Sequence, residues 1–320
     1  MALVEVQSLN TWFPILGGVF RRRTGWVYAL NDINLSINKG EVLAVVGESG
    51  CGKSTLGNSL LGLVTPTNGQ IEFDGRPIDI KNKSSWKPYR TELQIIFQDP
   101  YSSLNPRHTI FQILAEPLLL HKQATRKNVR SKVAELLSLV KLPEDSMDRY
   151  PHAFSGGQRQ RIGIARAIGL RPKLIVCDEV SSALDVSVQA QIIELLLDLK
   201  KRLDLTLLFI THDLSLVRHI AKRVVVMYSG RIVEIAPTEQ LFQKPRHPYT
   251  KALIDAIPLL DRNRKPALLK GEVPSQTTVR AGCDFASRCF KAQDRCFQEK
   301  PELTGQNSNE QFACFYPLTY

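Results

Sequence analysis

The sequence predicts an α/β protein built on a mainly parallel sheet with helices on both faces. Continuous apolar segments such as LIVC and LTLLFI are typical of buried strands, and amphipathic segments such as VRSKVAELLSLVKL (129–142) are typical of helices. Strands and helices of these kinds alternate along the chain, which favours the parallel arrangement. At 320 residues, there is room for one large domain with an appendage or for two modest domains.

The first half of the chain begins with half-buried strands. Alternating apolar and polar positions run through residues 1–46, as in VEVQSL and NDINLSI. EVLAVV (41–46) is a continuous apolar strand that leads into a glycine-rich turn, and a helical pattern follows over residues 53–63. QIEFDG (70–75) predicts a strand that ends in an Asp-Gly turn. From Pro106 to about Pro172 the pattern is mainly helical.

The second half alternates strands and helices until about Pro258. KLIVCDE (173–179) and TLLFITHD (206–213) are predicted strands, SVQAQIIELLLDLKKRL (187–203) is a long helix, and RVVVMYSGRIVEIA (223–236) is a pair of short strands. Periodicity then gives way to the Pro-, Gly- and charge-rich stretch DRNRKPALLKGEVPSQ. We therefore expect a main domain over residues 1–258 and a small cysteine-containing C-terminal extension over residues 259–320, without internal repeats.

Composition narrows the class of protein. The N-terminus, MALVEVQSLNTWFPI, lacks the basic segment and long apolar core of a secretory signal, and no apolar run approaches the roughly 18 residues of a membrane span. We therefore expect a cytoplasmic or membrane-peripheral protein. The formal net charge of +11 favours an anionic partner, which a nucleotide, a nucleic acid or a phospholipid surface equally satisfies. The tightest basic cluster, FRRR (20–23), is also compatible with a plain solvated loop.

The segment GESGCGKST (47–55) is the first to carry chemistry. It fits the phosphate-loop pattern from Gly47 to Ser54 and lies between a predicted strand and a predicted helix, as that loop requires. Its glycines let backbone N–H groups point inward around the β- and γ-phosphates. Lys53 supplies positive charge, Ser54 supplies a hydroxyl ligand for Mg²⁺, and the helix aims its positive end at the anion. A nucleoside triphosphate site is predicted, against the plainer interpretation of a glycine turn.

Two carboxylates end the strand KLIVCDE. Asp178 can hold Mg²⁺ through water, and Glu179 can polarise an attacking water. In isolation, two acids at this position are more often a solvated strand end. The phosphate loop upstream favours the catalytic interpretation, so both are candidate site residues.

The segment HAFSGGQRQR (152–161) indicates the class of protein. Residues 154–158 match the signature motif of ATP-binding cassette proteins, although a serine and two glycines that open a helix also suit a plain N-cap. The resemblance rests on the order of the motifs along the chain: the phosphate loop is followed by IIFQD, the signature, CDE, SALD and ITHD. The whole chain resembles this family. The resemblance implies a RecA-like P-loop NTPase core, an antiparallel β subdomain and an α-helical subdomain over about residues 100–172.

Roles for individual residues follow from the same resemblance. Gln98 resembles the Q-loop glutamine that contacts Mg²⁺ and the attacking water, His212 the switch histidine at the γ-phosphate, and Asp185 the D-loop residue that faces the partner chain. The implied catalytic residues are Glu179, His212 and Gln98, and the implied Mg²⁺ ligands are Ser54, Gln98 and Asp178. The implied residues for this chain's own ATP are Phe20, Gly47, Glu48, Ser49, Gly50, Cys51, Gly52, Lys53, Ser54 and Thr55. The signature residues that complete the partner's ATP site are Ser155, Gly156, Gly157 and Gln158.

The resemblance leaves more than one candidate for the aromatic residue that stacks on adenine, and the turn after the catalytic glutamate departs from the family's pattern. Counting back from ALNDI puts Phe20 where the family's stacking aromatic sits, but Trp26 and Tyr28 compete for the role, and either also suits the core. Val180 follows Glu179 where the family commonly has proline. Proline stiffens the turn but contributes no chemistry, so we expect looser geometry and retained hydrolysis.

One branch of the family is indicated by SSLNPRHTI (102–110), FQKPRHPYT (242–250) and the late cysteines. Together they resemble the ATPase subunits of bacterial dipeptide and oligopeptide importers, whose relatives import nickel chelates; the signature region is more similar to the second of the two non-identical ATPase subunits. The resemblance implies a heterodimer that sandwiches two ATP molecules, two integral-membrane permease subunits that dock on the helical subdomain, and an extracytoplasmic substrate-binding protein. This chain would lie peripherally on the cytoplasmic face of the inner membrane.

Two other functions compete with transport. A soluble cassette ATPase acting on nucleic acid agrees with the positive charge, but such proteins usually carry two cassettes in one chain, and no nucleic-acid partner is expected here. A regulatory nucleotide-binding module without turnover conflicts with the presence of Glu179 and His212.

Four of the six cysteines lie in the last forty residues, at Cys283, Cys289, Cys296 and Cys314. Structural disulfides are rare in a reducing cytoplasm, so the clustered thiols point to metal or redox chemistry. Zinc sites usually contain close C-x₂₋₄-C pairs, whereas these ligands are more widely spaced. The resemblance implies a [4Fe–4S] cluster in this tail, with zinc and free or oxidised thiols as alternatives. Cys51 and Cys177 are excluded, since one lies in the phosphate loop and the other in a buried strand.

Overall fold

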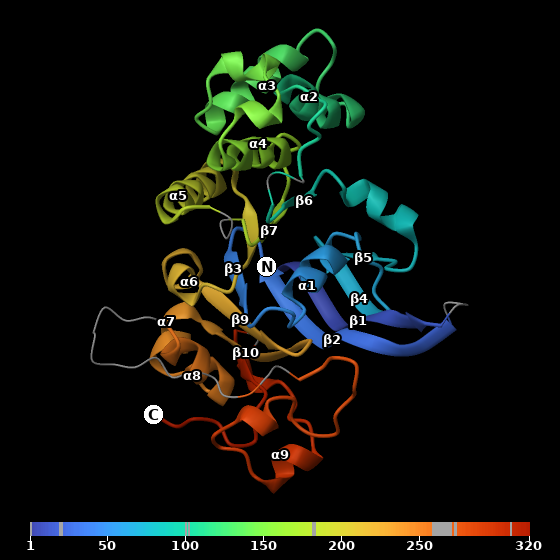
Figure 1. Cartoon of the computed structure of the whole chain (residues 1–320), viewed down its shortest axis with the longest axis vertical. Coiled ribbons are helices and arrows are strands. Elements are labelled where there is room, and N and C mark those ends of the chain that lie inside the picture. Colours follow the sequence, from blue (N-terminus) through green and yellow to red (C-terminus); the bar gives the residue numbers. More distant parts are fainter. Residues whose placement is uncertain are drawn as a thin grey trace. The chain divides into compact units, whose positions relative to one another are not determined.

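The computed structural model describes residues 2–18, 22–99, 101, 103–180, 184–257, 271, 274–307 and 309–320. The chain divides into two compact units, one formed by Met1–Trp86 with Ile210–Tyr320 and the other by Lys87–Phe209 (Figure 1). None of the helices in these described ranges is both long enough and apolar enough to cross a membrane.

The first unit contains an antiparallel sheet with the strand order β2-β1-β4-β5. Its strands are β1 (Ala2–Gly17), β2 (Arg22–Asn38), β4 (Asn68–Phe73) and β5 (Arg76–Ile78). Asp74 and Gly75 both have positive φ angles, of 52° and 70°, as the tight turn between β4 and β5 requires. The Asp-Gly turn predicted from the sequence is therefore confirmed.

A second group of strands in the first unit follows the order β11-β12-β10-β9-β3. Strand β3 (Val42–Val46) is parallel to β9 (Arg223–Tyr228), and β10 (Arg231–Pro237) returns antiparallel to β9. All five residues of β3 and all six of β9 are buried, as expected for strands covered on both faces. Helix α1 (Lys53–Leu60) follows β3, and α6 (Leu214–Ile220), α7 (Thr238–Gln243) and α8 (Pro248–Asp255) complete this part of the unit.

The C-terminal residues belong to the first unit. Strand β12 (Glu310–Phe312) pairs with β10, and β11 (Thr304–Asn307) pairs with β12, both antiparallel. The short 3₁₀ helix η4 (Ala286–Arg288) and helix α9 (Asp294–Gln298) precede them, in the orange and red part of Figure 1. The boundary after residue 258 stays a prediction, because residues 258–270 lie outside the described ranges.

The second unit combines three neighbouring strands with a group of helices. Strand β6 (Leu93–Ile96) is parallel to β7 (Leu174–Asp178), and β8 (Thr206–Ile210) follows β7 in the strand order. The helices are α2 (Ile110–Leu120), α3 (Val129–Leu139), α4 (Gly156–Ile168) and α5 (Val186–Leu203), with the 3₁₀ helices η2 (Glu144–Asp148) and η3 (Pro151–Ala153) before α4. A further 3₁₀ helix, η1 (Lys83–Tyr89), crosses the boundary between the units in sequence.

Candidate nucleotide-binding and catalytic site

The predicted phosphate loop lies between the end of β3 and the start of α1, in the first unit. Gly47 and Gly52 have φ angles of 153° and 104°. A Cβ atom at Gly47 would lie 2.2 Å from the carbonyl oxygen of Met227, and one at Gly52 would lie 2.4 Å from that of Ala29. Because neither position has room for a side chain, the loop can close tightly between its neighbours.

Lys53 lies inside this loop. Its side chain is almost fully buried, and its ammonium nitrogen donates hydrogen bonds to the carbonyl oxygens of Gly47 at 2.8 Å and Glu48 at 3.0 Å. The ammonium can exchange these carbonyl oxygens for those of an incoming phosphate, because a hydrogen bond to an ionised acceptor is stronger than one to a neutral carbonyl group. Gly52 is the N-cap of α1 and has no side chain, so no N-cap side chain bonds to the backbone N–H groups of the first turn, the kind of groups that bind phosphate at the start of a helix.

The remaining loop residues differ in exposure. Ser49, Gly50 and Ser54 are exposed, whereas Cys51 is fully buried. Burial raises the pKa of the Cys51 thiol, although the Lys53 ammonium partly opposes the effect. Cys51 is therefore held as a neutral thiol that packs under the loop.

His212 follows the strand β8 and precedes α6, on the same unit as the phosphate loop. The N–H of Thr211 donates to the carbonyl oxygen of Val45 at 3.1 Å, which fixes this segment beside β3. Asp213 caps α6 by accepting hydrogen bonds from the N–H groups of Ser215 at 2.9 Å and Leu216 at 3.2 Å. The His212 side chain between them is exposed.

In the second unit, Gln98 and Glu179 are brought together. Each follows one of the parallel strands β6 and β7, whose carboxyl ends meet because Ile96 is paired with Cys177. The Gln98 amide nitrogen donates a hydrogen bond to a Glu179 carboxylate oxygen at 2.9 Å. Asp178, the last residue of β7, lies at the same edge.

Glu179 has an unusual backbone conformation, with a φ angle of 46°. A non-glycine residue in this region carries a strain of about 1–3 kcal/mol, and such residues cluster at functional sites. Val180, which stands where the family commonly has proline, is buried. Its side chain therefore anchors the turn after Glu179 by packing.

The residues of the predicted signature form the start of α4. Ser155 is the exposed N-cap, and it forms a capping box in which its hydroxyl accepts from the Gln158 N–H while the Gln158 side chain accepts from the Ser155 N–H. A Cβ atom at Gly157 would lie 2.4 Å from the Cγ1 atom of Val188. Asp185 is the exposed N-cap of α5. The plain N-cap role and the signature role are thus compatible at Ser155.

The candidates for adenine stacking are only partly described. Phe20 lies outside the described residues. Trp26 and Tyr28 are half-buried and pack edge-on against Trp12, with ring centroids 6.4 Å and 5.3 Å away. The Arg23 guanidinium lies 4.9 Å from the centre of the Trp26 ring.

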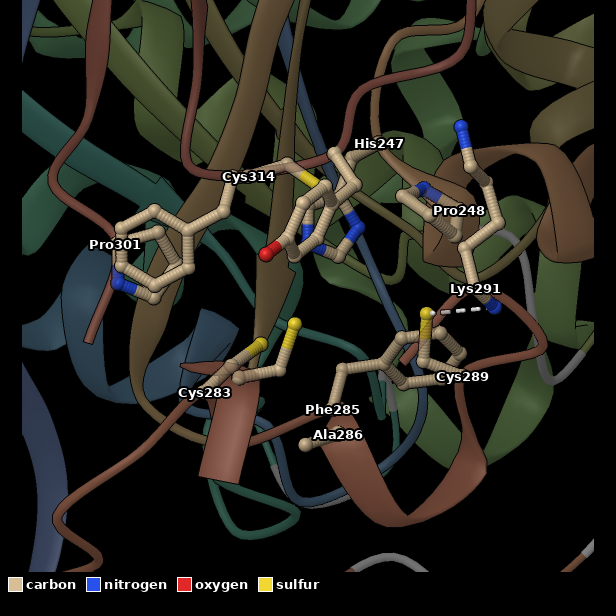
Figure 2. Close-up of a pocket in the computed structure, with 12 residues that line it drawn as sticks. His247, Pro248, Cys283, Phe285, Ala286, Cys289, Lys291, Pro301 and Cys314 are labelled. Carbon is tan, nitrogen blue, oxygen red and sulfur yellow. Dashed lines mark hydrogen bonds between the residues drawn. The ribbon is translucent and has the colours of Figure 1, made fainter. Parts of the chain in front are cut away.

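The four late cysteines, Cys283, Cys289, Cys296 and Cys314, line one pocket, which we call the four-cysteine pocket. Figure 2 shows it, with the residues Cys283, Cys289 and Cys314 labelled and sulfur in yellow. All six cysteines of the chain are free thiols. Among the described residues, no three His, Cys, Asp or Glu side chains are grouped so as to hold a metal ion.

Backbone N–H groups point at three of these sulfurs. The Lys291 N–H donates to the Cys289 sulfur at 3.4 Å, the dashed line in Figure 2, and the N–H groups of Phe285 and Tyr316 interact in the same way with Cys283 and Cys314. Burial raises the pKa of Cys283 and Cys314 to about 11 and also raises the pKa of Cys289. In each case the charge of a neighbouring cysteine adds to the increase, so the sulfurs are close enough to repel one another as thiolates.

Comparison with known proteins identifies the family of this chain. The family described as "ABC transporter" matches residues 30–182, and the family described as "Oligopeptide/dipeptide transporter, C-terminal region" matches residues 233–296. A solved structure of cbiO1 from Clostridium perfringens, part of the ABC transporter complex cbiONQ, is 29% identical with a TM-score of 0.64, covering 75% of this chain and 90% of that one. The cassette MJ0796, solved in a post-hydrolysis state bound to ADP and Pi, is 26% identical with a TM-score of 0.65, covering 73% and 98%. Fold and motif order are those of an ATP-binding cassette ATPase.

Sequence relatives specify the branch. The chain is 45% identical to the oligopeptide transport ATP-binding protein AppF of Bacillus subtilis, over 98% of this chain and 96% of the relative. It is 46% identical to OppF of Salmonella typhimurium, over 95% and 93%, and 47% identical to a probable peptide ABC transporter ATP-binding protein, y4tS, of Sinorhizobium fredii, over 98% and 89%. The chain belongs to the ABC transporter family, in the branch of oligopeptide and dipeptide transport ATP-binding proteins. The resemblance noticed in the sequence is confirmed.

Two residues near the phosphate loop were missed by sequence reasoning. Tyr249 and Arg288 both contact Glu48, although they lie about 200 and 240 positions further along the chain. Tyr249 belongs to the HPYT motif, and Arg288 lies inside the cysteine-rich segment. Nothing in either motif indicates the loop as its neighbour, because the contact exists only in the folded unit.

Proposed function

We propose that this chain hydrolyses ATP to drive the uptake of dipeptides or oligopeptides through separate permease subunits. The observation that carries the proposal is the identity of 44–47% with proteins named for peptide transport, which extends over 92–99% of this chain. The separate match of residues 233–296 to the oligopeptide/dipeptide C-terminal region supports the same branch. The chain would act peripherally, on the cytoplasmic face of the inner membrane.

The chemistry is the attack of water on the γ-phosphorus of ATP, which breaks the bond to the β–γ bridging oxygen and gives ADP and phosphate. Lys53 and the N–H groups of the loop would bind the phosphates, and Glu179 would accept hydrogen bonding from the attacking water and orient it. The Gln98 amide, 2.9 Å from the Glu179 carboxylate, holds that carboxylate in place. The family resemblance assigns His212 to the γ-phosphate of the same nucleotide.

Mg²⁺ fits the residue types at these positions. Ser54, Gln98 and Asp178 offer hydroxyl, amide and carboxylate oxygens, which are the ligands that this ion prefers. When bound, Mg²⁺ would neutralise charge that develops on the phosphate oxygens. Ser54 is exposed on the first turn of α1, and Asp178 is the last residue of a buried strand. Each side chain can therefore approach the ion while its helix or strand stays folded.

A second, non-identical ATPase subunit is part of the proposal. Ser155, Gly156, Gly157 and Gln158 would complete the ATP site of that subunit, with Asp185 beside the shared interface. Ser155 and Asp185 are both exposed N-caps and neither is covered within its own unit. Two permease subunits and an extracytoplasmic substrate-binding protein would complete the importer.

The four-cysteine pocket would hold a [4Fe–4S] cluster. Four thiols around one pocket, with N–H groups aimed at three sulfurs, suit thiolates whose charge must be stabilised. A single zinc ion would need Zn–S distances of about 2.3 Å, which brings its ligands close together. The described residues contain no group of three or more His, Cys, Asp or Glu side chains arranged to hold a metal ion, and the proposal rests on the four cysteines that line the pocket. Bound there, the cluster would supply folding free energy to the tail.

The metal proposal is tested by anaerobic purification of the full chain, followed by iron and sulfide analysis and visible absorption. About four irons and four sulfides per chain, lost in Cys289→Ser, are expected. Stoichiometric zinc in a colourless protein would reject the cluster.

The transport proposal is tested by measuring ATP hydrolysis in membranes that contain this chain with and without its candidate permease subunits. Permease-dependent hydrolysis and uptake of labelled peptide are expected. Hydrolysis that ignores the permease but responds to nucleic acid would indicate the soluble class, and permease-dependent uptake of nickel alone would assign a different ligand.

A further inference from the structure

The phosphate loop is held from outside by two residues of the C-terminal region. The hydroxyl of Tyr249, in α8, accepts a hydrogen bond from the Glu48 N–H at 2.9 Å. Arg288, at the end of η4, meets the Glu48 carboxylate with both terminal nitrogens, at 2.7 Å and 3.0 Å. We call Glu48, Tyr249 and Arg288 the Glu48 clamp. All three residues belong to the first unit.

The two-point contact of Arg288 is buried rather than superficial. Its side chain is 4% exposed and that of Glu48 is 25% exposed. The same guanidinium also donates to the Tyr228 hydroxyl at 3.2 Å. A bidentate pair in such a place is directional as well as attractive, so it fixes the orientation of the Glu48 side chain.

Tyr249 is equally constrained. Its ring is fully buried and packs edge-on against Tyr228, with ring centroids 4.6 Å apart. Phe285 packs against both tyrosines, with centroids 5.3 Å from each. The Tyr249 hydroxyl therefore has little freedom to move. Because it accepts the hydrogen bond from the Glu48 N–H, it restrains the backbone of the loop at that residue.

The clamp and the four-cysteine pocket share their supports. Arg288 is followed directly by Cys289, and Phe285 lies two residues after Cys283. His247, which lines the pocket, accepts a hydrogen bond on Nδ1 from the Tyr249 N–H at 3.0 Å. Both arms of the clamp are thus linked to residues that line the pocket, of which Figure 2 labels His247, Phe285 and Cys289.

We propose that Arg288 and Tyr249 are positioning residues that hold the phosphate loop at Glu48, and that the ligation state of the four-cysteine pocket sets this chain's affinity for ATP through them. The inference rests on the proposed role of the loop in binding ATP. In this proposal both residues act through Glu48 and not by contact with the nucleotide. Each acts by keeping the loop in the conformation that accepts phosphate. The apparent affinity for ATP is proportional to the fraction of molecules whose loop is in that conformation.

The first test measures the dissociation constant of a fluorescent ATP analogue with Mg²⁺ for the purified full chain. Arg288→Met keeps the length of the side chain but removes the fork. If the loop then holds its binding conformation one time in ten, affinity falls about tenfold. Tyr249→Phe removes only the hydroxyl and is expected to weaken binding about threefold, and Arg288→Lys is expected to recover part of the loss. If Arg288→Met does not fold, Tyr249→Phe and Glu48→Gln carry the test.

Controls separate the clamp from the general role of the loop. Lys251→Met removes an ion pair with Asp255 on the same helix as Tyr249 and is expected to leave affinity unchanged. Lys53→Ala is expected to weaken binding directly, because it removes the positive charge offered to the phosphates. If the unmodified chain does not bind the analogue, the proposed function fails; if it binds and both Arg288→Met and Tyr249→Phe bind equally well, only the clamp is rejected.

The second test addresses the pocket. Cys289→Ser is expected to weaken binding of the analogue in the otherwise unchanged chain, but to add little in the Arg288→Met background, because the path is already broken. Equal losses in both backgrounds, or no loss in either, would overturn the coupling between the pocket and the loop.

Discussion

Replacing Glu179 by glutamine tests the catalytic carboxylate with little disturbance of the structure. Glutamine keeps the size of the side chain and one oxygen that can accept a hydrogen bond. The Gln98 amide nitrogen, which lies 2.9 Å from a Glu179 carboxylate oxygen, can donate to that oxygen in the variant. The strained backbone, with φ at 46°, places the same demand on both residues. We therefore expect Glu179→Gln to change the free energy of unfolding by no more than about 0.5 kcal/mol.

The expected effect on turnover is much larger. A positioned general base contributes about 10²–10⁴-fold to a rate, which corresponds to about 2.7–5.5 kcal/mol of the barrier. Glu179 would orient water without being needed to bind phosphate, so nucleotide affinity should be retained. The predicted variant therefore binds ATP normally and hydrolyses it at no more than about 1% of the usual rate.

The assay compares steady-state hydrolysis by the assembled complex with nucleotide affinity, for the unmodified chain, Glu179→Gln and Glu194→Gln. Glu194 is an exposed carboxylate on α5 in the same unit and serves as the matched control. Near-normal hydrolysis in Glu179→Gln would remove Glu179 from the role of base. Weak nucleotide binding with unchanged stability would show instead that the carboxylate serves binding.

Four further predictions concern separate parts of the molecule. Lys53→Ala is expected to weaken nucleotide binding itself, unlike Glu179→Gln, and an unchanged dissociation constant would contradict the role of the ammonium. The chain alone is expected to be a poor ATPase, and a monomer that hydrolyses ATP at the rate of the complex, independent of concentration, would refute the shared site. Ser155→Ala should lose about 1 kcal/mol of stability with the capping box; Ser155→Asp should restore the cap but not the turnover, whereas full activity in Ser155→Asp would leave only the N-cap role. Because burial raises the pKa of the Cys177 thiol, iodoacetamide at pH 8 should label Cys177 only after unfolding, and rapid labelling of the folded chain would contradict its burial.

The elements nearest the nucleotide motifs were the most predictable from sequence. EVLAVV and RVVVMY are continuous apolar runs and became the buried strands β3 and β9, since strands covered on both faces need apolar side chains throughout. The helix predicted over residues 187–203 is α5, which ends where Asp204 takes a left-handed conformation with φ at 51°. Position in the motif order also located Gln98 and Glu179, which the structure then joined by a hydrogen bond.

The C-terminal residues were harder to predict because their structure depends on distant partners. TGQN and EQF have no alternating apolar pattern, yet they form β11 and β12 by pairing outward from β10. Phe285 reads as an isolated apolar residue in a polar segment, but it is 1% exposed because it packs on Tyr228 and Tyr249. Contacts of this kind leave no local signal in sequence. The Glu48 clamp was invisible for the same reason.

The most direct measurement is the ATPase rate of the purified membrane complex that contains this chain, its partner ATPase subunit and its permease subunits. Candidate substrate-binding proteins are added in turn, each loaded with a dipeptide, with an oligopeptide or with a nickel chelate, and the complex carrying Glu179→Gln serves as the blank. Peptide import predicts that a peptide-loaded binding protein raises the rate well above the ligand-free level and that the rise disappears in the blank. A complex whose rate is indifferent to every peptide-loaded binding protein, or rises only with the nickel-loaded one, would contradict it.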